Sequence, residues 1–108
     1  GKMWEAIDDL NEAVDVTPGH PDVLVLRGSA YRQLESYDLA LQDLNLALKL
    51  DPDHPEGLLE RGIVHRLTGR IMAARVDWLR LAARHEGRPA AEAAQRNLEL
   101  LDFNPAEK

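Results

Sequence analysis

The sequence contains four histidines, which are the residues best suited to bind a metal ion or transfer protons near neutral pH. Their spacing argues against both roles. No His-x-x-x-His pair occurs, and there is no His-Glu-x-x-His segment. His20 and His54 fall in equivalent turns one repeat apart, and His65 takes a core-type position. Because cysteine is also absent, we predict no metal site and no cofactor.

Catalytic nucleophiles are equally hard to find. The candidate hydroxyls, those of Thr17, Ser29, Ser36 and Thr68, have no base at a spacing that would activate them. The glycines are isolated and form no phosphate-binding loop. We therefore predict that this chain is not an enzyme.

The residues that position these groups follow an internal repeat with a fixed period. Pro18, His20 and Pro21 recur as Pro52, His54 and Pro55, and the pair Arg27-Gly28 recurs as Arg61-Gly62. Self-similarity at a fixed period of this length is typical of helical repeat arrays. Within each unit, apolar residues recur at helical spacing, and proline or glycine marks the ends. The expected helices are residues 3–16, 21–34, 37–50, 55–67, 71–84 and 89–101.

Arginine and aspartate also recur with the repeat. Arg27 and Arg61 are equivalent, as are Asp9, Asp43 and Asp77. A partly buried charge is costly without a partner. We expect each arginine to pair with an aspartate, either of its own unit or of the unit before, as a structural clamp. Binding of a ligand by these residues is the alternative.

Charge is distributed unevenly along the chain. Residues 1–56 contain 12 acidic and 4 basic residues, whereas residues 57–108 contain 7 acidic and 9 basic ones. A basic strip is expected from a series of arginines at spacings of four or five: Arg66, Arg70, Arg75, Arg80, Arg84 and Arg88. Nucleic-acid binding is not expected, because the net charge is −6 and only Trp78 accompanies the strip. An acidic protein surface, including the first half of another copy, fits the strip better.

The composition, 44% hydrophobic and 30% charged, is that of a folded soluble protein. No apolar run approaches the roughly 20 residues that span a bilayer, and no signal peptide is visible. We predict no membrane association. The compartment is not identified by the sequence, although the cytoplasm is slightly favoured.

The small and apolar residues of the repeat carry a resemblance to a known family. The first complete unit matches the tetratricopeptide signature at Leu24, Gly28, Tyr31, Ala40, Leu44, Ala47 and Pro52. The next unit continues it at Leu58, Gly62, Ala74 and Trp78. The chain therefore resembles a bacterial-type tetratricopeptide repeat domain. Three departures mark the second unit: His65 replaces the tyrosine, Leu81 stands where alanine is usual, and the closing proline is missing.

The resemblance implies an all-α fold, a right-handed superhelical array of antiparallel helix pairs with about 2.5 repeats and a C-terminal capping helix. We expect one domain over residues 1–108. It divides into the second helix of a truncated repeat (1–18), a full repeat (21–52), a divergent repeat (55–86) and the capping helix (89–101). Because residues 1–2 fall where the turn inside a unit belongs, we expect the chain to be a fragment with an exposed first helix.

In this family the first helices of successive units line a concave groove. The resemblance assigns to it Asp22, Val25, Ser29, Arg32 and Gln33, then Glu56, Leu59, Glu60, Ile63 and Arg66, with Ala90, Ala93 and Asn97 from the last helix. Apolar anchors among acids suit a peptide with an apolar side chain and positive charge. Relatives that bind the tails of heat-shock chaperones use a Lys/Asn/Arg constellation, but Glu56 and Glu60 stand where its cations are needed.

We therefore predict a protein–protein interaction module that binds a partner peptide or protein segment, of apolar and basic character, in the groove. One alternative is a structural scaffold that self-associates through the exposed N-terminal helix. The other is an accessory or regulatory segment of a larger enzyme.

Overall fold

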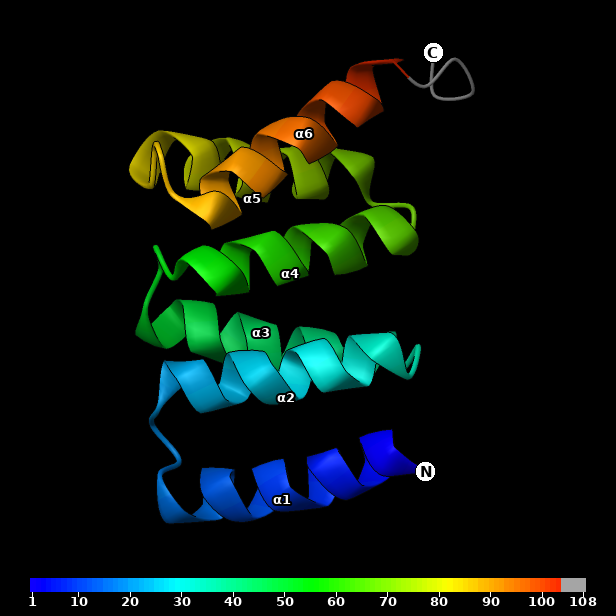
Figure 1. The fold of residues 1–108 in the computed structure, drawn as a ribbon, viewed down its shortest axis with the longest axis vertical. Coiled ribbons are helices and arrows are strands. Elements are labelled where there is room, and N and C mark those ends of the chain that lie inside the picture. The colour runs from blue at the N-terminus through cyan, green and yellow to red at the C-terminus, as the bar shows by residue number, and fades with distance from the viewer. Residues whose placement is uncertain (104–108) are drawn as a thin grey trace.

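The computed structural model describes residues 1–103, which form six α-helices joined by short turns. The helices are α1 (Lys2–Val16), α2 (Pro21–Gln33), α3 (Tyr37–Leu50), α4 (Pro55–Leu67), α5 (Ile71–Arg84) and α6 (Pro89–Phe103). Figure 1 shows that they stack one above another along the longest dimension of the molecule, which measures 43 Å. The predicted all-α helical solenoid is confirmed.

The predicted helix limits are exact for α3, α4 and α5. The other three differ at one end. Helix α1 begins at Lys2, one residue before the expected start, and α6 continues to Phe103 rather than ending at residue 101. Helix α2 ends at Gln33, because the chain turns at Glu35 with a φ of 61°. At the equivalent position after α4, Gly69 has a φ of 83°.

Proline begins the first helix of each pair. Pro21, Pro55 and Pro89 are the first residues of α2, α4 and α6, where the missing N–H of proline has no helical partner to lose. His54 caps α4, because its Nδ1 accepts the N–H of Gly57 at 3.0 Å. These local signals place the starts of α2, α4 and α6 on the same side of the stack (Figure 1).

Within each pair, a glycine permits close contact between the two helices. A Cβ on Gly28 of α2 would lie 2.9 Å from Cγ of Leu44 on α3. A Cβ on Gly62 of α4 would lie only 2.1 Å from Nε1 of Trp78 on α5. Both glycines are therefore required by packing, and the recurring helical glycine of the sequence has a physical reason.

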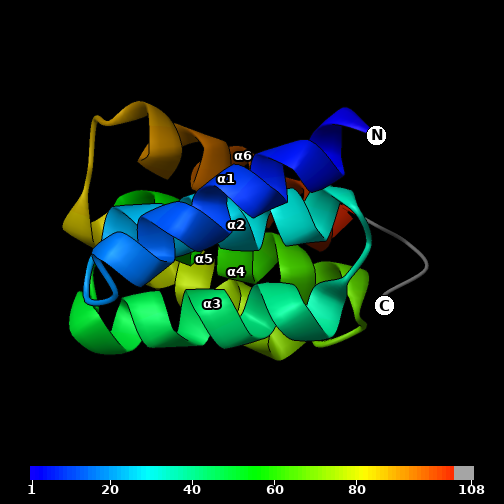
Figure 2. The ribbon, with the colours of Figure 1, turned by 90° about the horizontal axis from the view of Figure 1, so that it is seen from below.

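Successive pairs stack mainly through the second helix of one pair and the first helix of the next, α3 on α4 and α5 on α6, and the first helices also contact one another, α2 with α4 and α4 with α6. Viewed along the stack, α3 lies at one side of the molecule and α6 at the other, with α2 and α4 between them (Figure 2). One core cluster holds Leu24, Val25, Ala40, Leu44, Ala47 and Val64. A second cluster joins α6 to the array through Leu48, Leu58, Ala74, Trp78, Leu81, Ala91, Ala94, Leu98 and Leu101. The face formed by α2, α4 and α6 is thus continuous.

Candidate functional site

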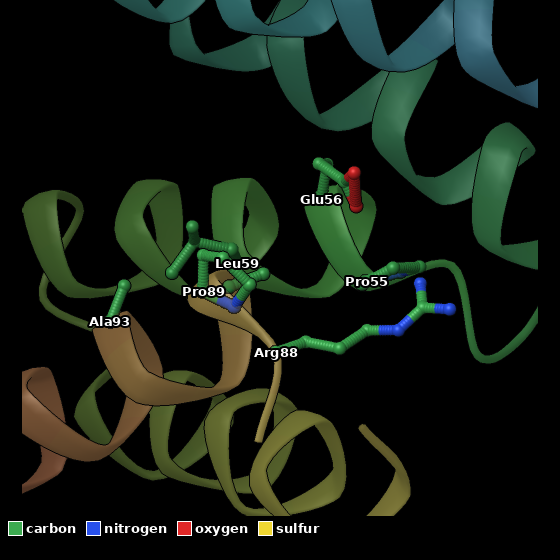
Figure 3. A pocket seen from close by; sticks show the side chains of 7 residues that line it. Pro55, Glu56, Leu59, Arg88, Pro89 and Ala93 are labelled. Carbon is green, nitrogen blue, oxygen red and sulfur yellow. The ribbon is translucent and has the colours of Figure 1, made fainter. Parts of the chain in front are cut away.

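A hollow of about 390 Å³ lies between α4 and α6 on this face (Figure 3). Its lining is mostly apolar and comes from the N-terminal parts of both helices and from the residue before α6: Pro55, Glu56, Leu59, Arg88, Pro89, Ala90 and Ala93. Concave sites with an apolar lining and few polar groups are the usual form of a binding site. The hollow includes two of the predicted groove residues of α4, Glu56 and Leu59, and two of α6, Ala90 and Ala93.

The hollow exists because small side chains of α6 face a larger one of α4. Ala90 and Ala93 are half-buried and leave space beside Leu59, which is half-buried as well. The backbone behind Leu59 is held in place, since its carbonyl oxygen accepts the Nε1–H of Trp78 at 3.2 Å. Trp78 therefore supports the wall of the hollow from the core side.

Two opposite charges border the hollow. Glu56 and Arg88 are both exposed, and within residues 1–103 neither side chain forms an ion pair. In Figure 3 the Glu56 side chain lies above Pro55, and the Arg88 side chain extends away from Leu59 toward Pro55. Both charges are therefore available to a bound molecule.

Three predicted groove residues instead bind one another. Glu60 of α4 accepts hydrogen bonds from Arg32 of α2, at 2.6 Å from Nε and 3.4 Å from Nη2. Ser29 Oγ donates to the same carboxylate at 3.2 Å. The partners are far apart in the sequence and gave no local signal for this bridge, which joins neighbouring repeats. The charge of Glu60 is therefore already balanced.

A second groove acid also has a partner. Asp22 accepts a hydrogen bond from Nε2 of His54 at 2.6 Å. Since Nδ1 of the same ring accepts the Gly57 N–H, the hydrogen of this imidazole sits on Nε2. His54 thus caps α4 and ties it to α2, a structural role.

The prediction that Val25 faces the groove is wrong. Its side chain is only 5% exposed, and it packs in the core between α2 and α4. A Cβ on Gly57 would come within 3.3 Å of its Cγ2, so the glycine makes room for Val25. The other predicted groove positions remain accessible in part: Ile63 and Asn97 are half-buried, whereas Gln33 and Arg66 are exposed.

Both expected arginine clamps are present, and the structure shows which aspartate each arginine binds. Arg27 donates to Asp43 through Nε and Nη2, both at 2.7 Å, and Arg61 holds Asp77 in the same way at 2.8 and 2.7 Å. Each aspartate belongs to the same unit as its arginine. The hydrogen bond to Asp43 raises the pKa of Arg27 above its usual value. These pairs hold the helices of one repeat together.

Sequence reasoning missed the third member of each clamp. Nη1 of Arg27 donates to Asn11 at 3.0 Å, and Nη1 of Arg61 donates to Asn45 at 3.2 Å. Each asparagine lies on the second helix of the preceding unit, so one guanidinium joins three helices. The signal was available, because the two asparagines also occupy equivalent positions of successive repeats.

The remaining histidines have surroundings that suit structure rather than chemistry. His85 binds the carbonyl oxygen of Asp53 through Nε2. His65 is mostly buried, its Nε2 lies 3.8 Å from Oδ2 of Asp77, and its Nδ1 has no partner among the described residues. Burial lowers the pKa of His65 from 6.5. Among the described residues, no three His, Asp or Glu side chains come together as a metal site would require.

The predicted basic strip is interrupted by acids. Arg75 donates to Asp102 at 2.8 Å, and Arg80 donates to Asp53 at 2.7 Å. The latter bond lowers the pKa of Asp53. Arg84 Nε also lies 3.9 Å from Asp53, so three of the six arginines have an acidic partner and the positive surface is not continuous. None of the helices in residues 1–103 is long and apolar enough to cross a membrane.

Comparison with family models gives one match. Residues 28–69, which cover the second half of α2, all of α3 and all of α4, match the model described as a TPR repeat. No curated protein sequence matches the chain.

Several solved structures share the fold. The first TPR of Spaghetti (RPAP3), solved bound to the HSP90 peptide SRMEEVD, has a TM-score of 0.82 at 26% identity, over 96% of this chain and 82% of that one. The TPR domain of Arabidopsis OM64 has a TM-score of 0.81 at 20% identity, over 92% and 82% of the two chains. A tetratricopeptide repeat protein from Parabacteroides merdae has a TM-score of 0.81 at 28% identity, over 99% of this chain and 42% of that one.

Proposed function

The chain is built from tetratricopeptide repeats, and from this premise we propose that it binds a segment of a partner protein on the face of α2, α4 and α6. Domains of this family generally mediate protein–protein interaction. The observation that supports the proposal most directly is the hollow between α4 and α6, with its apolar lining and two free charges. In this proposal α6 caps the array and supplies one wall of the site.

An apolar side chain of the partner enters the hollow and packs on Leu59, Ala90 and Ala93. Complete burial of one large aliphatic or aromatic side chain contributes about 1.5–3 kcal/mol. Interfaces obtain much of their affinity from such central anchors. The anchor is therefore the main source of affinity, and the charges around it set the sequence preference.

The proposed partner carries a basic residue near its apolar anchor. Among the groove acids of residues 1–103, only Glu60 is paired with a cation, Arg32, whereas Glu56 has no ion-pair partner and Asp22 keeps its charge beside the neutral imidazole of His54. The groove is therefore less acidic than its composition indicates, and the preference for a cation rests on Glu56 and Asp22. Arg88, at the start of α6, borders the same hollow and accommodates an acidic group of the partner. This pair of charges favours one direction of the bound segment.

The related domain from Spaghetti (RPAP3) holds the acidic peptide SRMEEVD. Here Glu56 borders the hollow, and the nearby cation Arg32 is occupied by Glu60. An acidic tail would meet the carboxylate of Glu56, and Arg88 is the single cation among the residues that line the hollow. We infer that the partner of this chain differs from that peptide in charge.

Selection from a displayed library of random peptides tests the proposal. The recovered peptides are titrated against the unaltered chain, against Leu59→Asp, and against the control Val76→Asp, whose site on α5 is 63% exposed. We expect Leu59→Asp to weaken binding at least tenfold, since it places a charge where the anchor is buried. The control should bind as the unaltered chain does. Equal binding by Leu59→Asp would contradict the proposal.

A further inference from the structure

The outer surface of α5 carries a line of apolar side chains that face solvent. Met72, Val76 and Leu79 are 70%, 63% and 53% exposed, and Ala83 is exposed as well. Their spacing of four, three and four residues places all of them on one face of the helix. We call these residues the outer stripe. Helix α5 thus has an apolar face toward solvent in addition to the face that packs in the core.

The fold does not require an apolar stripe at this place. The equivalent residues of α3, one repeat earlier, are all polar or charged: Asp38, Gln42, Asn45 and Lys49. All of them are exposed, although α3 lies inside the array and another helix pair follows it (Figure 1). Exposure at these positions is therefore a property of the outer side of a second helix and has no connection with the ends of the chain. An apolar stripe that α5 carries and α3 lacks indicates contact with another molecule.

A hollow of about 400 Å³ lies beside the outer stripe, between α3 and α5. Val76 belongs to both, and the almost completely buried Leu48 and Leu58 close the hollow toward the core. The rest of its lining is polar or charged apart from one proline: Asn45, Lys49, Pro52, Arg61, Asp77 and Arg80. An apolar side chain that packs on Val76 therefore finds a recess with polar groups around it.

The charges beside the outer stripe are mainly positive. The arginine–aspartate clamp between α4 and α5 is internally balanced. Lys49 is exposed, and within residues 1–103 it forms no ion pair. Arg80 and Arg84 share a single carboxylate, that of Asp53, at 2.7 and 3.9 Å. These three cations and one acid leave two positive charges, so the surface is complementary to an acidic molecule.

We propose that the outer stripe docks an acidic amphipathic α-helix of a partner protein. The stripe follows the axis of α5 over eleven residues, about 17 Å, so a helix laid along it makes contact through residues at helical spacing. One apolar side chain of that helix enters the hollow beside Val76, and its carboxylates pair with Lys49 and with Arg80 or Arg84. This surface is separate from the hollow between α4 and α6, prefers the opposite charge, and does not rest on the function proposed for that hollow.

The charge of α5 selects this occupant over a second copy of the chain. The helix contains Arg75, Arg80 and Arg84, and its one acid, Asp77, is buried. Two copies that packed through their outer stripes would bring these arginines together, which disfavours a symmetric dimer. A helix with carboxylates beside its apolar side chains is complementary to the same surface.

Two synthetic helical peptides, titrated against the full chain by fluorescence anisotropy, test the proposal. Both carry leucines at the spacing of the outer stripe. They differ only in the flanking residues, which are glutamates in one peptide and lysines in the other. We expect saturable binding of the glutamate peptide. The lysine peptide should bind about tenfold more weakly, because its charges repel Lys49 and Arg80 where the glutamates attract them.

Variants of the chain identify the surface that the glutamate peptide occupies. Val76→Asp should weaken its binding about tenfold, because a carboxylate then stands in the apolar contact. Lys49→Glu should weaken the glutamate peptide about threefold and strengthen the lysine peptide, a reversal that a purely apolar contact would not produce. Val16→Asp is the matched control, since Val16 is 80% exposed on α1, at the other end of the stack from α5 (Figure 1). It should change neither affinity.

Absence of saturable binding, equal binding of the two peptides, or equal affinities of Val76→Asp and Val16→Asp would overturn the proposal. So would sedimentation of the chain alone as a dimer that Val76→Asp dissociates, because the occupant would then be a second copy. Binding to phosphatidylserine vesicles that Val76→Asp abolishes would also overturn it, since the face would then serve an anionic lipid surface. A basic peptide bound in the hollow between α4 and α6 should leave the outer stripe unperturbed, so the two proposals fail separately.

Discussion

Gly62 lies directly against the indole of Trp78, and a Cβ at position 62 would fall 2.1 Å from Nε1. No rotamer of a neighbouring side chain can relieve such an overlap without moving the ring, which is itself fully buried. The corresponding contact in the preceding repeat, between Gly28 and Leu44, is looser at 2.9 Å. The two repeats therefore share one glycine but differ in how strictly they need it.

Gly62→Ala should lower the free energy of unfolding by about 2 kcal/mol, because overpacking outweighs the helical propensity gained by alanine. Gly28→Ala should lower the free energy of unfolding clearly less, because the side chain of Leu44 can shift. Urea denaturation measures both. The double variant Gly62→Ala/Trp78→Leu places a leucine against position 62, as Leu44 lies against Gly28, and should lose much less stability than the sum of the losses of the two single variants. Equal losses for the two glycine variants would contradict this explanation.

Glu35 follows α2 with a φ of 61°, a conformation that costs a non-glycine residue about 1–2 kcal/mol. Glu35→Gly should therefore raise the free energy of unfolding by about 1 kcal/mol, less the extra flexibility of glycine in the unfolded chain. Gly69→Ala, at the equivalent turn after α4, is the matched control and should be destabilising. Thermal unfolding of both variants checks the prediction, which fails if Glu35→Gly is less stable than the unaltered chain.

His65→Tyr should make stability less dependent on pH. Burial lowers the pKa of His65 in the folded chain below its ordinary value of 6.5, so the unfolded chain takes up a proton first as the pH falls. The stability contributed by neutral His65 is thus complete above pH 6.5 and is lost as the pH falls toward the folded pKa. Tyrosine stands at the equivalent position 31 of the preceding repeat, so the substitution replaces the imidazole by a side chain that the same packing position already accepts.

The prediction is checked by measuring the free energy of unfolding of the unaltered chain and of His65→Tyr between about pH 5 and 8. The other three histidines are present in both chains, so the difference between the curves isolates His65. The difference should grow as the medium becomes more acidic. Parallel curves would show that His65 contributes nothing to the pH dependence.

Most of the fold was predictable because its causes are local and repeated. The helices could be located within a few residues from two signals in the sequence. Prolines 21, 55 and 89 begin three of them, and apolar residues recur at helical spacing in all of them. The end of α2 was missed by one residue, because the turn there uses Glu35 rather than a glycine with an obvious signal. The arginine–aspartate clamps were also predictable, since an arginine on a core-facing stripe needs a partner.

The sequence was a poorer guide to which groove side chains are exposed and which are covered or already bonded to a neighbour. The position of a residue in the repeat indicates which face of the array it occupies. It does not indicate whether a side chain on the next helix covers that residue or pairs with it. Val25 is covered because Gly57 lets α4 approach α2, and Glu60 is neutralised by Arg32 from the preceding repeat. The hollow depends on Ala90 and Ala93, whose significance appears only when α6 packs beside α4. Each of these outcomes depends on contacts between repeats.

The central claim is that the hollow between α4 and α6 receives an apolar side chain of the partner. Amide chemical-shift mapping of the chain, with a peptide recovered by display selection, tests it most directly. The largest changes should occur at Leu59, Ala90 and Ala93, and they should vanish in Leu59→Asp. Largest changes on the outer surface of α5, around Met72 and Val76, would contradict the account.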